Sequence, residues 1–581
     1  MPVEDLPKLD VEDAGVSAED LAAAVSEALP AKPAPKIPEL TKPSDLASCA
    51  TEVLRGEGIS HDKVRTIFDL TCKALKMIGS MVNSTDGGCY YFYRLNPKLL
   101  NLDTRAFENF LSALSGLATS EKEFKHVLAL IKTAASSLTP FKIKTGSSWA
   151  DNGDLLVSFG GREVFRIAPH GSVTTEVNGE SDLFYMLDSP SPLTLDTTAT
   201  GEFTKWFPEQ FSLAETEYLS AADQRIALQV SIASAYVPAE SHVIDLHLGA
   251  PEAGKTTGAN MVGKLMLGQD EFSSFPIKEK GQDAVEAALT NDIVVGIDNL
   301  DAESTWFVDT ASAWSTGAKF KKRILFTTNE LGTFEPRAQK LSASANDQKF
   351  SDLGLCQRAV VFRYDFPRTV TEDAVLYRQV EEHRPRILGE MMSMLSKAVT
   401  SMKINTPPKM PFRMVAFAEL GWHLHKAGCF EGRTEDDWIE LLGRLSKAQL
   451  ELAGERDSTV EIVRELMEMN TAQRVVLLRV IGFGEKAQAT EAFATSQSLI
   501  TNMQMKDFYK AYAWVAADGN YPFVKSPNAL SRKLTAFKRA IESALKVKLL
   551  LTKQHGRAYI TIKPDIDRIE SEIQADTRDA A

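Results

Sequence analysis

A glycine-rich octapeptide near the middle of the chain constrains the fold more than any other feature. It reads Gly249-Ala250-Pro251-Glu252-Ala253-Gly254-Lys255-Thr256 and fits the pattern G-x-x-x-x-G-K-[ST]. Residues 241–248 before it predict a buried strand, and residues 257–267 after it have helical spacing. A strand, a glycine loop and a helix in this order direct backbone N–H groups and a helix N-terminus at an anion. The segment therefore predicts a phosphate-binding loop in an α/β domain with a parallel sheet.

This loop gives roles to individual residues. Residues 249–257, which include Thr257, are expected to surround the phosphates of a nucleotide. Lys255 is expected to reach the β- and γ-phosphates, and the Thr256 hydroxyl to bind Mg²⁺. ATP with Mg²⁺ is therefore the expected cofactor.

A second part of the same site follows about 40 residues later, where residues 291–298 form an apolar strand that ends in Asp298. A carboxylate at a strand end is suited to the Mg²⁺ shell, so Asp298 is the second expected metal residue. Asn299 follows, where many hydrolysing ATPases have an acid. It can orient a water but cannot take its proton, and Asp301 is a nearby substitute.

Residues 322–329 predict another apolar strand, which ends in Asn329. An asparagine at the tip of a strand adjacent to Asp298 can position the attacking water, although a simple strand-to-loop cap is the alternative. Arg358 precedes the apolar strand 359–362 and is our first candidate for a finger that reaches a neighbouring subunit's γ-phosphate. Arg323, Arg384 and Arg386 are its rivals, and a structural ion pair is the alternative for each.

Two basic segments are candidates for nucleic-acid contact. The first contains Lys319, Lys321, Lys322 and Arg323 around Phe320, which suits a phosphate backbone and a stacked base. A solvated turn is the alternative.

The second basic segment is C-terminal: residues 525–563 hold ten lysines and arginines but one acid, Glu542. Leu530, Leu534, Phe537 and Ile541 form an apolar stripe, with Arg532 and Lys533 off it. Two strands at 549–552 and 557–562 follow. A helix followed by such a hairpin is typical of a winged helix, which binds nucleic acid or, alternatively, protein.

Composition and length limit the remaining options. The chain has 581 residues, a net charge of −13 and five scattered cysteines. Nucleic acid must therefore bind locally, and a reducing, cytoplasmic compartment is expected, in a bacterial host for a chain that a bacterium or a virus encodes. No apolar run approaches the roughly 20 residues of a membrane helix, and the acidic N-terminus does not resemble a signal peptide. The expected organisation is an acidic, Pro-rich tail (1–44), a helical domain (45–145), a β-rich module (146–214), the nucleotide-binding domain (215–366), a helical region (367–474), a winged helix (475–563) and an acidic tail (564–581).

Taken together, these motifs resemble the AAA+ ATPases of the superfamily 3 helicase type, and more closely the helicase half of phage, plasmid and poxvirus primase-helicases. The resemblance extends over about residues 155–417 and is most specific in the Asp298-Asn299 pair and in Arg384-Pro385-Arg386-Ile387-Leu388-Gly389. Segments 165–167, 306–317, 323–327 and 411–414 also match. The resemblance implies a hexameric ring that translocates on nucleic acid, generally single-stranded DNA, with ATP, in the replication of a mobile element.

The chain departs from this family in three places. Residues 340–345 stand where the family often has a Pro-x-x-Leu-Asn-Gly-Ile segment, which leaves the sensor role open between Asn329 and a residue of that stretch. Arg358 lies in Leu355-Cys356-Gln357-Arg358 rather than in an Asp-Arg pair. The first 150 residues contain no recognisable primase, although they remain a candidate surface for a primase or another replication partner.

The interpretation that best fits the sequence is an ATP-dependent translocase or helicase. The alternative is a nucleotide-switched initiator, loader or defence-type remodelling ATPase that hydrolyses slowly, which the missing acid at Asn299 and the negative charge favour. A P-loop kinase is a third option, against which the multidomain length and the winged helix argue.

Overall fold

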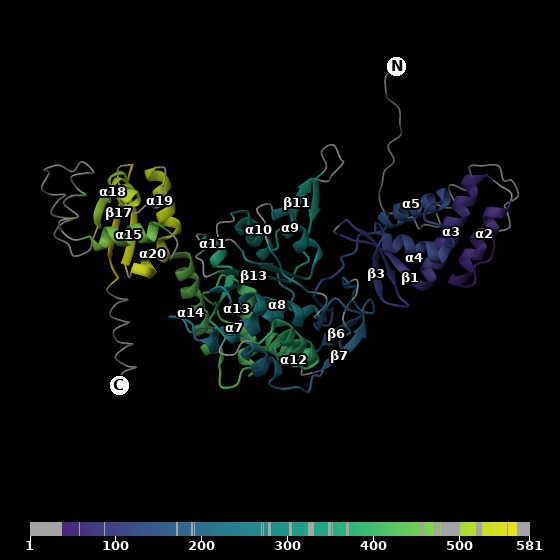
Figure 1. Ribbon diagram of the computed structural model, residues 1–581, viewed down its shortest axis with the longest axis horizontal. Coiled ribbons are helices and arrows are strands. Elements are labelled where there is room, and N and C mark those ends of the chain that lie inside the picture. The colour runs from purple at the N-terminus through teal and green to yellow at the C-terminus, as the bar shows by residue number, and fades with distance from the viewer. Residues whose placement is uncertain are drawn as a thin grey trace, which may run out of the picture. The chain divides into compact units, whose positions relative to one another are not determined.

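The structure is a computed structural model in which the chain forms two compact units, Met1–Phe141 and Lys142–Ala581 (Figure 1). The residues that it describes are 38–56, 59–85, 87–169, 172–187, 190, 192–268, 270, 272–276, 281–300, 305–323, 331–346, 350, 352–367, 371–454, 458–469, 473, 477, 500–518, 524, 526–545, 547–554 and 556–565. The expected tails therefore lie largely outside the described residues.

The first unit combines helices with a small antiparallel sheet. Its elements are η1 (Pro43–Asp45), α2 (Leu46–Arg55), α3 (Ser60–Ile78), β1 (Gly79–Asn83), β2 (Cys89–Tyr93), β3 (Lys98–Asn101), α4 (Arg105–Ser115) and α5 (Lys122–Ser136), with strand order β1-β2-β3. Tyr91 of β2 is fully buried, packs against Phe107 and Phe110, and donates a hydrogen bond to the Leu75 carbonyl oxygen at 2.9 Å. The prediction of a purely helical domain missed these strands, because they are too short for a clear alternation and their aromatic residues are buried by the helices.

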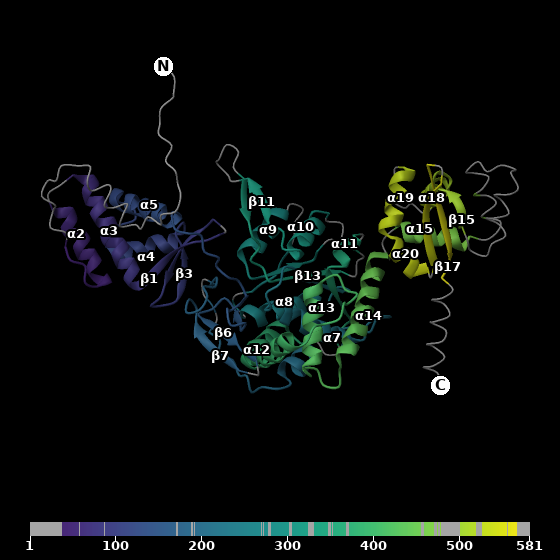
Figure 2. The same ribbon diagram turned by 180° about the vertical axis from the view of Figure 1, so that it is seen from behind.

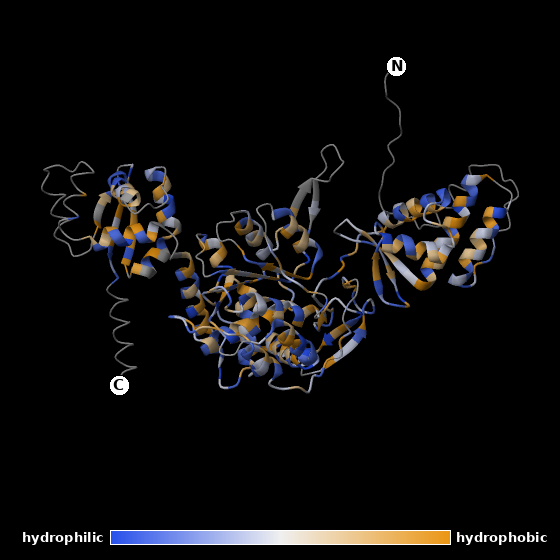
Figure 3. Ribbon diagram, viewed as in Figure 1, coloured by the Kyte–Doolittle hydropathy of each residue, from blue (hydrophilic) through white to orange (hydrophobic). Residues whose placement is uncertain are grey.

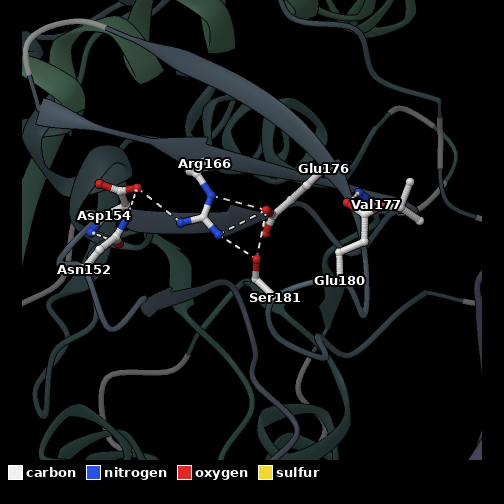
Figure 4. Close-up of polar contacts among 7 residues, drawn as sticks. All are labelled: Asn152, Asp154, Arg166, Glu176, Val177, Glu180 and Ser181. Atoms are coloured by element: carbon white, nitrogen blue, oxygen red, sulfur yellow. Dashed lines mark hydrogen bonds and ion pairs between the residues drawn. The ribbon is translucent and has the colours of Figure 1, made fainter.

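The second unit begins with the predicted β-rich module. Its antiparallel strands follow chain order: β4 (Ser147–Trp149), β5 (Leu155–Ser158), β6 (Glu163–Ile167) and β7 (Val173–Val177). The predicted hairpin over 154–167 is confirmed as the β5–β6 pair. Arg166 of β6 lies between the carboxylates of Asp154 and Glu176, at 3.2 and 3.1 Å, and donates to the Ser181 hydroxyl at 2.6 Å (Figure 4). The arginine therefore joins β6 to β7 and to the segments that flank the sheet.

The predicted parallel sheet is present at the centre of this unit. It contains β8 (Ile244–Gly249), β9 (Phe275–Pro276), β10 (Val294–Asp298), β13 (Lys340–Asn346) and β14 (Ala359–Tyr364), in the order β14-β8-β13-β10-β9. All the pairings between these strands are parallel. Their side chains alternate between two apolar clusters, since Val360 and Phe362 enter one and Ile244, Leu246 and Val361 the other.

Helices cover both faces of the sheet (Figure 1). One cluster is shared with α7 (Ala221–Ser234), α8 (Lys255–Leu267), α12 (Asp373–Ile404), α13 (Val415–Lys426) and part of α14 (Glu435–Gly454), together with η3 (Glu202–Trp206) and α6 (Phe207–Glu209). The other is shared with α9 (Gln282–Asn291), α10 (Thr305–Ser315) and α11 (Leu353–Cys356). The carboxyl ends of β8, β13 and β10 therefore open between two helical layers, which is where open α/β sheets place their sites.

The strand beside β10 corrects one expectation. We expected residues 322–329 there, but β10 lies between β13 and β9, and β11 (Phe320–Arg323) instead pairs antiparallel with β12 (Leu331–Phe334). Residues 340–345 of β13 are all buried. The small side chains of β13 allow it to pack between β8 and β10. The described part of 322–329 belongs instead to the separate β11–β12 ribbon.

The Arg-Pro-x-Ile-Leu-Gly run has a packing role on α12. Arg384 is 2% exposed and donates to the carbonyl oxygens of Leu265 and Met266 at 2.8 and 3.1 Å, which caps the C-terminus of α8. A Cβ atom on Gly389 would lie 2.0 Å from the carbonyl oxygen of Asp196, so only glycine lets that segment pass. Arg386 pairs with Glu202 at 3.0 Å. Arg386 thus forms the kind of structural ion pair that was the alternative to an arginine finger, whereas the contacts of Arg384 are with carbonyl oxygens.

The C-terminal elements form their own apolar cluster. They are α15 (Ser458–Glu468), β15 (Ile500–Gln504), α18 (Met505–Asp518), α19 (Pro527–Ala536), α20 (Lys538–Leu545), β16 (Val547–Gln554) and β17 (Arg557–Pro564), with strand order β15-β17-β16. The predicted stripe of Leu530, Leu534, Phe537 and Ile541 is buried, and apolar residues follow the strands (orange in Figure 3). The predicted hairpin is confirmed by the β16–β17 pairing. α15, which we had placed in the preceding helical region, packs in this cluster.

Two buried histidines predict a loss of stability in mild acid. Burial lowers the pKa of His247 to about 3 and that of His425 to about 4, whereas a histidine in an unfolded chain titrates near 6.5. Below about pH 6.5 the unfolded chain therefore binds a proton at each of these histidines that the folded chain does not bind, and each contributes about 1.4 kcal/mol per pH unit; His242, whose pKa burial also lowers to about 4, adds to the effect. We expect the free energy of unfolding, measured by urea titration from pH 7.5 to 5, to fall accordingly. The slope should be shallower by one proton in His425→Phe, and an unchanged slope would contradict this account.

Candidate functional site

The glycine loop connects a buried strand to a helix, as predicted. β8 ends at Gly249 and α8 begins at Lys255. A Cβ atom on Gly249 would lie 2.8 Å from the carbonyl oxygen of Tyr364, so a larger residue does not fit beside β14. Gly254 has a φ of 83°, in the left-handed region that glycine adopts without strain. The chain thereby enters α8 with the helix N-terminus at the carboxyl ends of the strands.

Lys255 lies inside this loop. Its side chain is buried, and its Nζ atom donates a hydrogen bond to the carbonyl oxygen of Ala250 at 3.0 Å. Burial lowers the pKa of Lys255, and the carboxylate of Asp298 acts in the opposite direction. The ammonium group is therefore held within the loop by one weak neutral partner, and an anion in the loop would stabilise its charged form.

Thr256 and Asp298 meet at the tips of α8 and β10. The Thr256 hydroxyl donates to Oδ1 of Asp298 at 2.7 Å. A hydroxyl that donates its proton to a carboxylate keeps its lone pairs free, and the two groups together present oxygen ligands of the kind that Mg²⁺ prefers. The two predicted metal residues are thus brought together, 42 positions apart in the chain.

Asn299 turns the chain away from β10. Its φ of 52° lies in the left-handed region, where asparagine is enriched among non-glycine residues. Its Nδ2 atom donates to Oδ2 of Asp298 at 3.3 Å. Asn299 is therefore adjacent to the predicted metal residues, as expected, while Asp301 lies outside the described residues.

β13 supplies two residues that we did not single out in the sequence. Ser344 donates to Oδ1 of Asp298 at 2.7 Å and lies 3.2 Å from the Thr256 hydroxyl. Asn346 ends the strand, is exposed, and is in register with Gly249. Asn346 therefore occupies the strand-tip position that we had expected for Asn329, which lies outside the described residues. The sequence signals for this strand were the alternating polar and small residues of 340–346 and the place of 340–345 in the resemblance, which had left the sensor role open to this stretch.

A pocket of about 1030 Å³ opens beside the loop. It is lined by residues 252–257 of the loop and α8, by segment 209–215 and by parts of 364–376. Thr257, at the rim, donates to Oδ1 of Asp373 at 2.9 Å and so joins α8 to the start of α12. The volume is at the upper end of what small-ligand pockets provide and is sufficient for a nucleotide.

Arg358 lies at the amino ends of the strands, opposite the end that carries the glycine loop. It precedes Ala359, which pairs with Ile244 at the start of β8, whereas Tyr364 pairs with Gly249 at the loop. A strand of six residues spans about 17–20 Å, so Arg358 does not reach its own loop. Its Nη1 atom donates to the Gly354 carbonyl oxygen at 2.7 Å, and burial lowers its pKa, with Arg413 adding to the effect.

The first basic segment lies on the β11–β12 ribbon. Both views show β11 on the side of α9 and α10, away from α12 (Figures 1 and 2). Lys321, Lys322 and Arg323 are in its first strand, and Lys319 forms an ion pair with Glu335. In the second basic segment, Arg532 is exposed and the ammonium group of Lys533 lies 6.0 Å from the centre of the Phe537 ring. The structure thus separates the two predicted nucleic-acid segments from the glycine loop.

Comparison with known proteins places the site in a replication context. Residues 210–435 match the family described as actinomycete integrative conjugative element replication protein. This segment contains the glycine loop, Asp298 and Ser344, although it is less than half of the chain. The chain is therefore similar, over its nucleotide-site region, to replication proteins of a mobile element.

Other comparisons add little to this match. The chain also resembles two solved structures of the NrS-1 C-terminal region, an A form apo structure (TM-score 0.40, 11% identity) and another apo structure (0.39, 10%). Each alignment covers 85% of this chain and 98% of the other. No curated protein sequence matches the chain. Among the described residues, no helix is long and apolar enough to cross a lipid bilayer.

Proposed function

We propose that this protein is an ATP-dependent nucleic-acid translocase or helicase that acts in the replication of a mobile element. The observation that carries the proposal is the convergence of Lys255, Thr256 and Asp298 at the glycine loop, where Lys255 and Thr256 line the pocket and Thr256 is hydrogen-bonded to Asp298. A cationic loop, a hydroxyl and a carboxylate are what a Mg²⁺-nucleotide requires, and the family match of residues 210–435 adds the replication context.

Different residues of the site would hold the phosphates, the metal ion and the attacking water. Residues 249–257 would hold the phosphates, with Lys255 at the β- and γ-phosphates, and Thr256 and Asp298 would hold Mg²⁺. Bound Mg²⁺ neutralises charge on the phosphate oxygens. Asn299 and Asn346 would orient a water at the strand tips, and Asn329 remains a candidate for that role. Arg358 would complete the site of a neighbouring subunit in a ring, because it cannot reach its own.

The nucleic-acid contacts would come from both basic segments. Strand β11 contains Lys321, Lys322 and Arg323 at consecutive positions, and subunit rotations would move the β11–β12 ribbon along single-stranded DNA in a ring. The C-terminal cluster has the element order of a winged helix, in which β16 and β17 form the wing. Exposed Arg532 and half-buried Lys533 on α19 support its use for phosphate contact.

A nucleotide-switched initiator or loader is the second candidate. The observation that favours it is Asn299, whose amide donates to Asp298 and cannot accept a proton from water. Such a protein would bind ATP, change partners and hydrolyse slowly.

Stimulation of ATP turnover by DNA separates the two candidates. For a translocase we expect single-stranded DNA to raise the steady-state ATPase rate several-fold, and Lys321→Ala/Lys322→Ala to reduce the ratio of stimulated to unstimulated rate, because two phosphate contacts are lost. Arg94→Ala, in the first unit, is the control for loss of a basic side chain.

Each outcome of this experiment supports a different conclusion. Stimulation that disappears at higher salt and in the double variant supports the motor. Tight ATP binding with negligible turnover, with or without DNA, supports the switch and excludes the helicase. A double variant that is stimulated like the wild type shows that the ribbon does not contact DNA.

A further inference from the structure

Ser344 connects every part of the metal-binding corner. Its hydroxyl donates to Oδ1 of Asp298 at 2.7 Å, lies 3.2 Å from Oγ1 of Thr256, and accepts from the backbone N–H of Asn299 at 3.2 Å. Its backbone oxygen also accepts from the N–H of Leu300 at 2.8 Å. One fully buried residue therefore contacts the loop helix, the carboxylate and the turn that follows it.

The numbers of protons and lone pairs on the two hydroxyl groups decide which group donates in each contact. A serine hydroxyl has one proton and two lone pairs, and a threonine hydroxyl has the same. Both hydroxyls donate to the same carboxylate oxygen of Asp298, so Ser344 fixes that oxygen independently of Thr256. The lone pairs of Thr256 then remain available, and the position of the carboxylate does not depend on the bond that Thr256 makes.

We infer that Ser344 is a positioning residue that pre-orients Thr256 and Asp298 for a divalent cation bound with a nucleotide. The inference rests on the proposed nucleotide site and goes beyond it, because Ser344 is assigned no contact with the nucleotide. Ser344 acts by holding the Asp298 carboxylate and by tethering the left-handed turn at Asn299 through two N–H groups. A pre-oriented oxygen pair costs less to order when the cation binds.

The same strand supplies a matched control. Ser342 lies two residues away on the same face of β13, is 1% exposed, and its hydroxyl oxygen has no hydrogen-bond partner within the described part of the chain. Ser342→Ala therefore makes the same chemical change in the same strand without touching Asp298, Thr256 or Asn299.

The test is equilibrium binding of a fluorescent ATP analogue to the full chain, with Mg²⁺ and with EDTA, alongside the melting temperature of the nucleotide-free protein. We expect Ser344→Ala to weaken binding about tenfold in Mg²⁺ and to leave binding in EDTA unchanged, since an oriented hydrogen bond to a charged group is lost. Ser344→Thr keeps the hydroxyl and should restore the Mg²⁺-dependent part, and Ser342→Ala should match the wild type in both conditions.

The alternatives are distinguishable. Wild-type chain that binds no nucleotide in either condition overturns the proposed function and this inference with it. Wild-type binding that is retained in full by Ser344→Ala overturns the inference alone. Equal losses in Mg²⁺ and EDTA, or a large drop in melting temperature that Ser344→Thr does not reverse, show a purely structural role. If Ser344→Ala does not fold, Ser344→Cys, with its weaker donor, replaces it, and an unchanged Mg²⁺ dependence in that variant contradicts the inference.

Discussion

Replacing Lys255 with alanine should reduce ATP turnover about 100- to 1000-fold, because a preorganised cation at the transferred phosphate contributes that much to the rate. The ammonium group lies in the loop with one neutral hydrogen-bond partner, the Ala250 carbonyl oxygen. Its burial makes the charged form costly until an anion arrives, as the direction of its pKa indicates. Lys255→Ala therefore removes the cation that would contact the phosphate, and the Ala250 carbonyl oxygen cannot take its place.

The control for this variant lies on the same helix. Lys264 donates to the Phe272 carbonyl oxygen at 3.0 Å, lies 5.0 Å from the centre of the Tyr377 ring, and does not line the pocket. Steady-state turnover and the melting temperature should be measured for Lys255→Ala and Lys264→Ala. We expect the first to lose turnover with little change in melting temperature, and the second to retain turnover. Turnover within threefold of the wild type in Lys255→Ala would place ATP hydrolysis elsewhere in the chain.

The sequence was most informative where chemistry demands particular residues at a fixed spacing. A phosphate-binding loop needs Gly249, Gly254 and Lys255 at their fixed spacing. The strand that ends in Asp298 could be recognised by its continuous apolar run. The β5–β6 hairpin and the β16–β17 hairpin followed from alternation and turn residues. These elements could be predicted because local sequence and tertiary environment favour the same conformation.

The strand β13 could not be predicted, because its environment overrides its local sequence. Lys340, Ser342 and Ser344 are polar, yet all are buried. The apolar run of 324–326 appeared a better strand by local pattern, and so Asn329 was the first candidate for the sensor, with a residue of 340–345 as the alternative. A lysine becomes acceptable in a sheet core only when a distant residue supplies its counter-charge, and a pattern read along the chain does not contain that information.

Loss of the residue that balances the charge of a buried partner is expected to have the largest effect on stability. Asp245 of β8 lies 2.7 Å from the ammonium group of Lys340, and both side chains are at most 1% exposed. Ser231 of α7 donates to the other carboxylate oxygen at 2.7 Å and contacts the ammonium group. Burial raises the pKa of Asp245 and lowers that of Lys340, and each partner opposes the shift of the other. Each group therefore offsets part of the cost that burial imposes on the charge of the other.

Lys340→Met should lower the free energy of unfolding by about 3–5 kcal/mol, because it leaves a buried carboxylate without its cation. Lys340→Met/Asp245→Leu removes both charges and should recover most of this loss, since apolar residues of similar volume replace a desolvated pair. Lys205→Met is the matched control, because it breaks an exposed pair with Glu431 that has a similar length of 2.9 Å, and it should change stability little. Urea unfolding of the nucleotide-free protein measures all three. If the double variant is no more stable than Lys340→Met, the pair is needed for more than charge compensation, and the register of β13 against β8 is the next feature to test, since Leu341 pairs with Ile244 beside it.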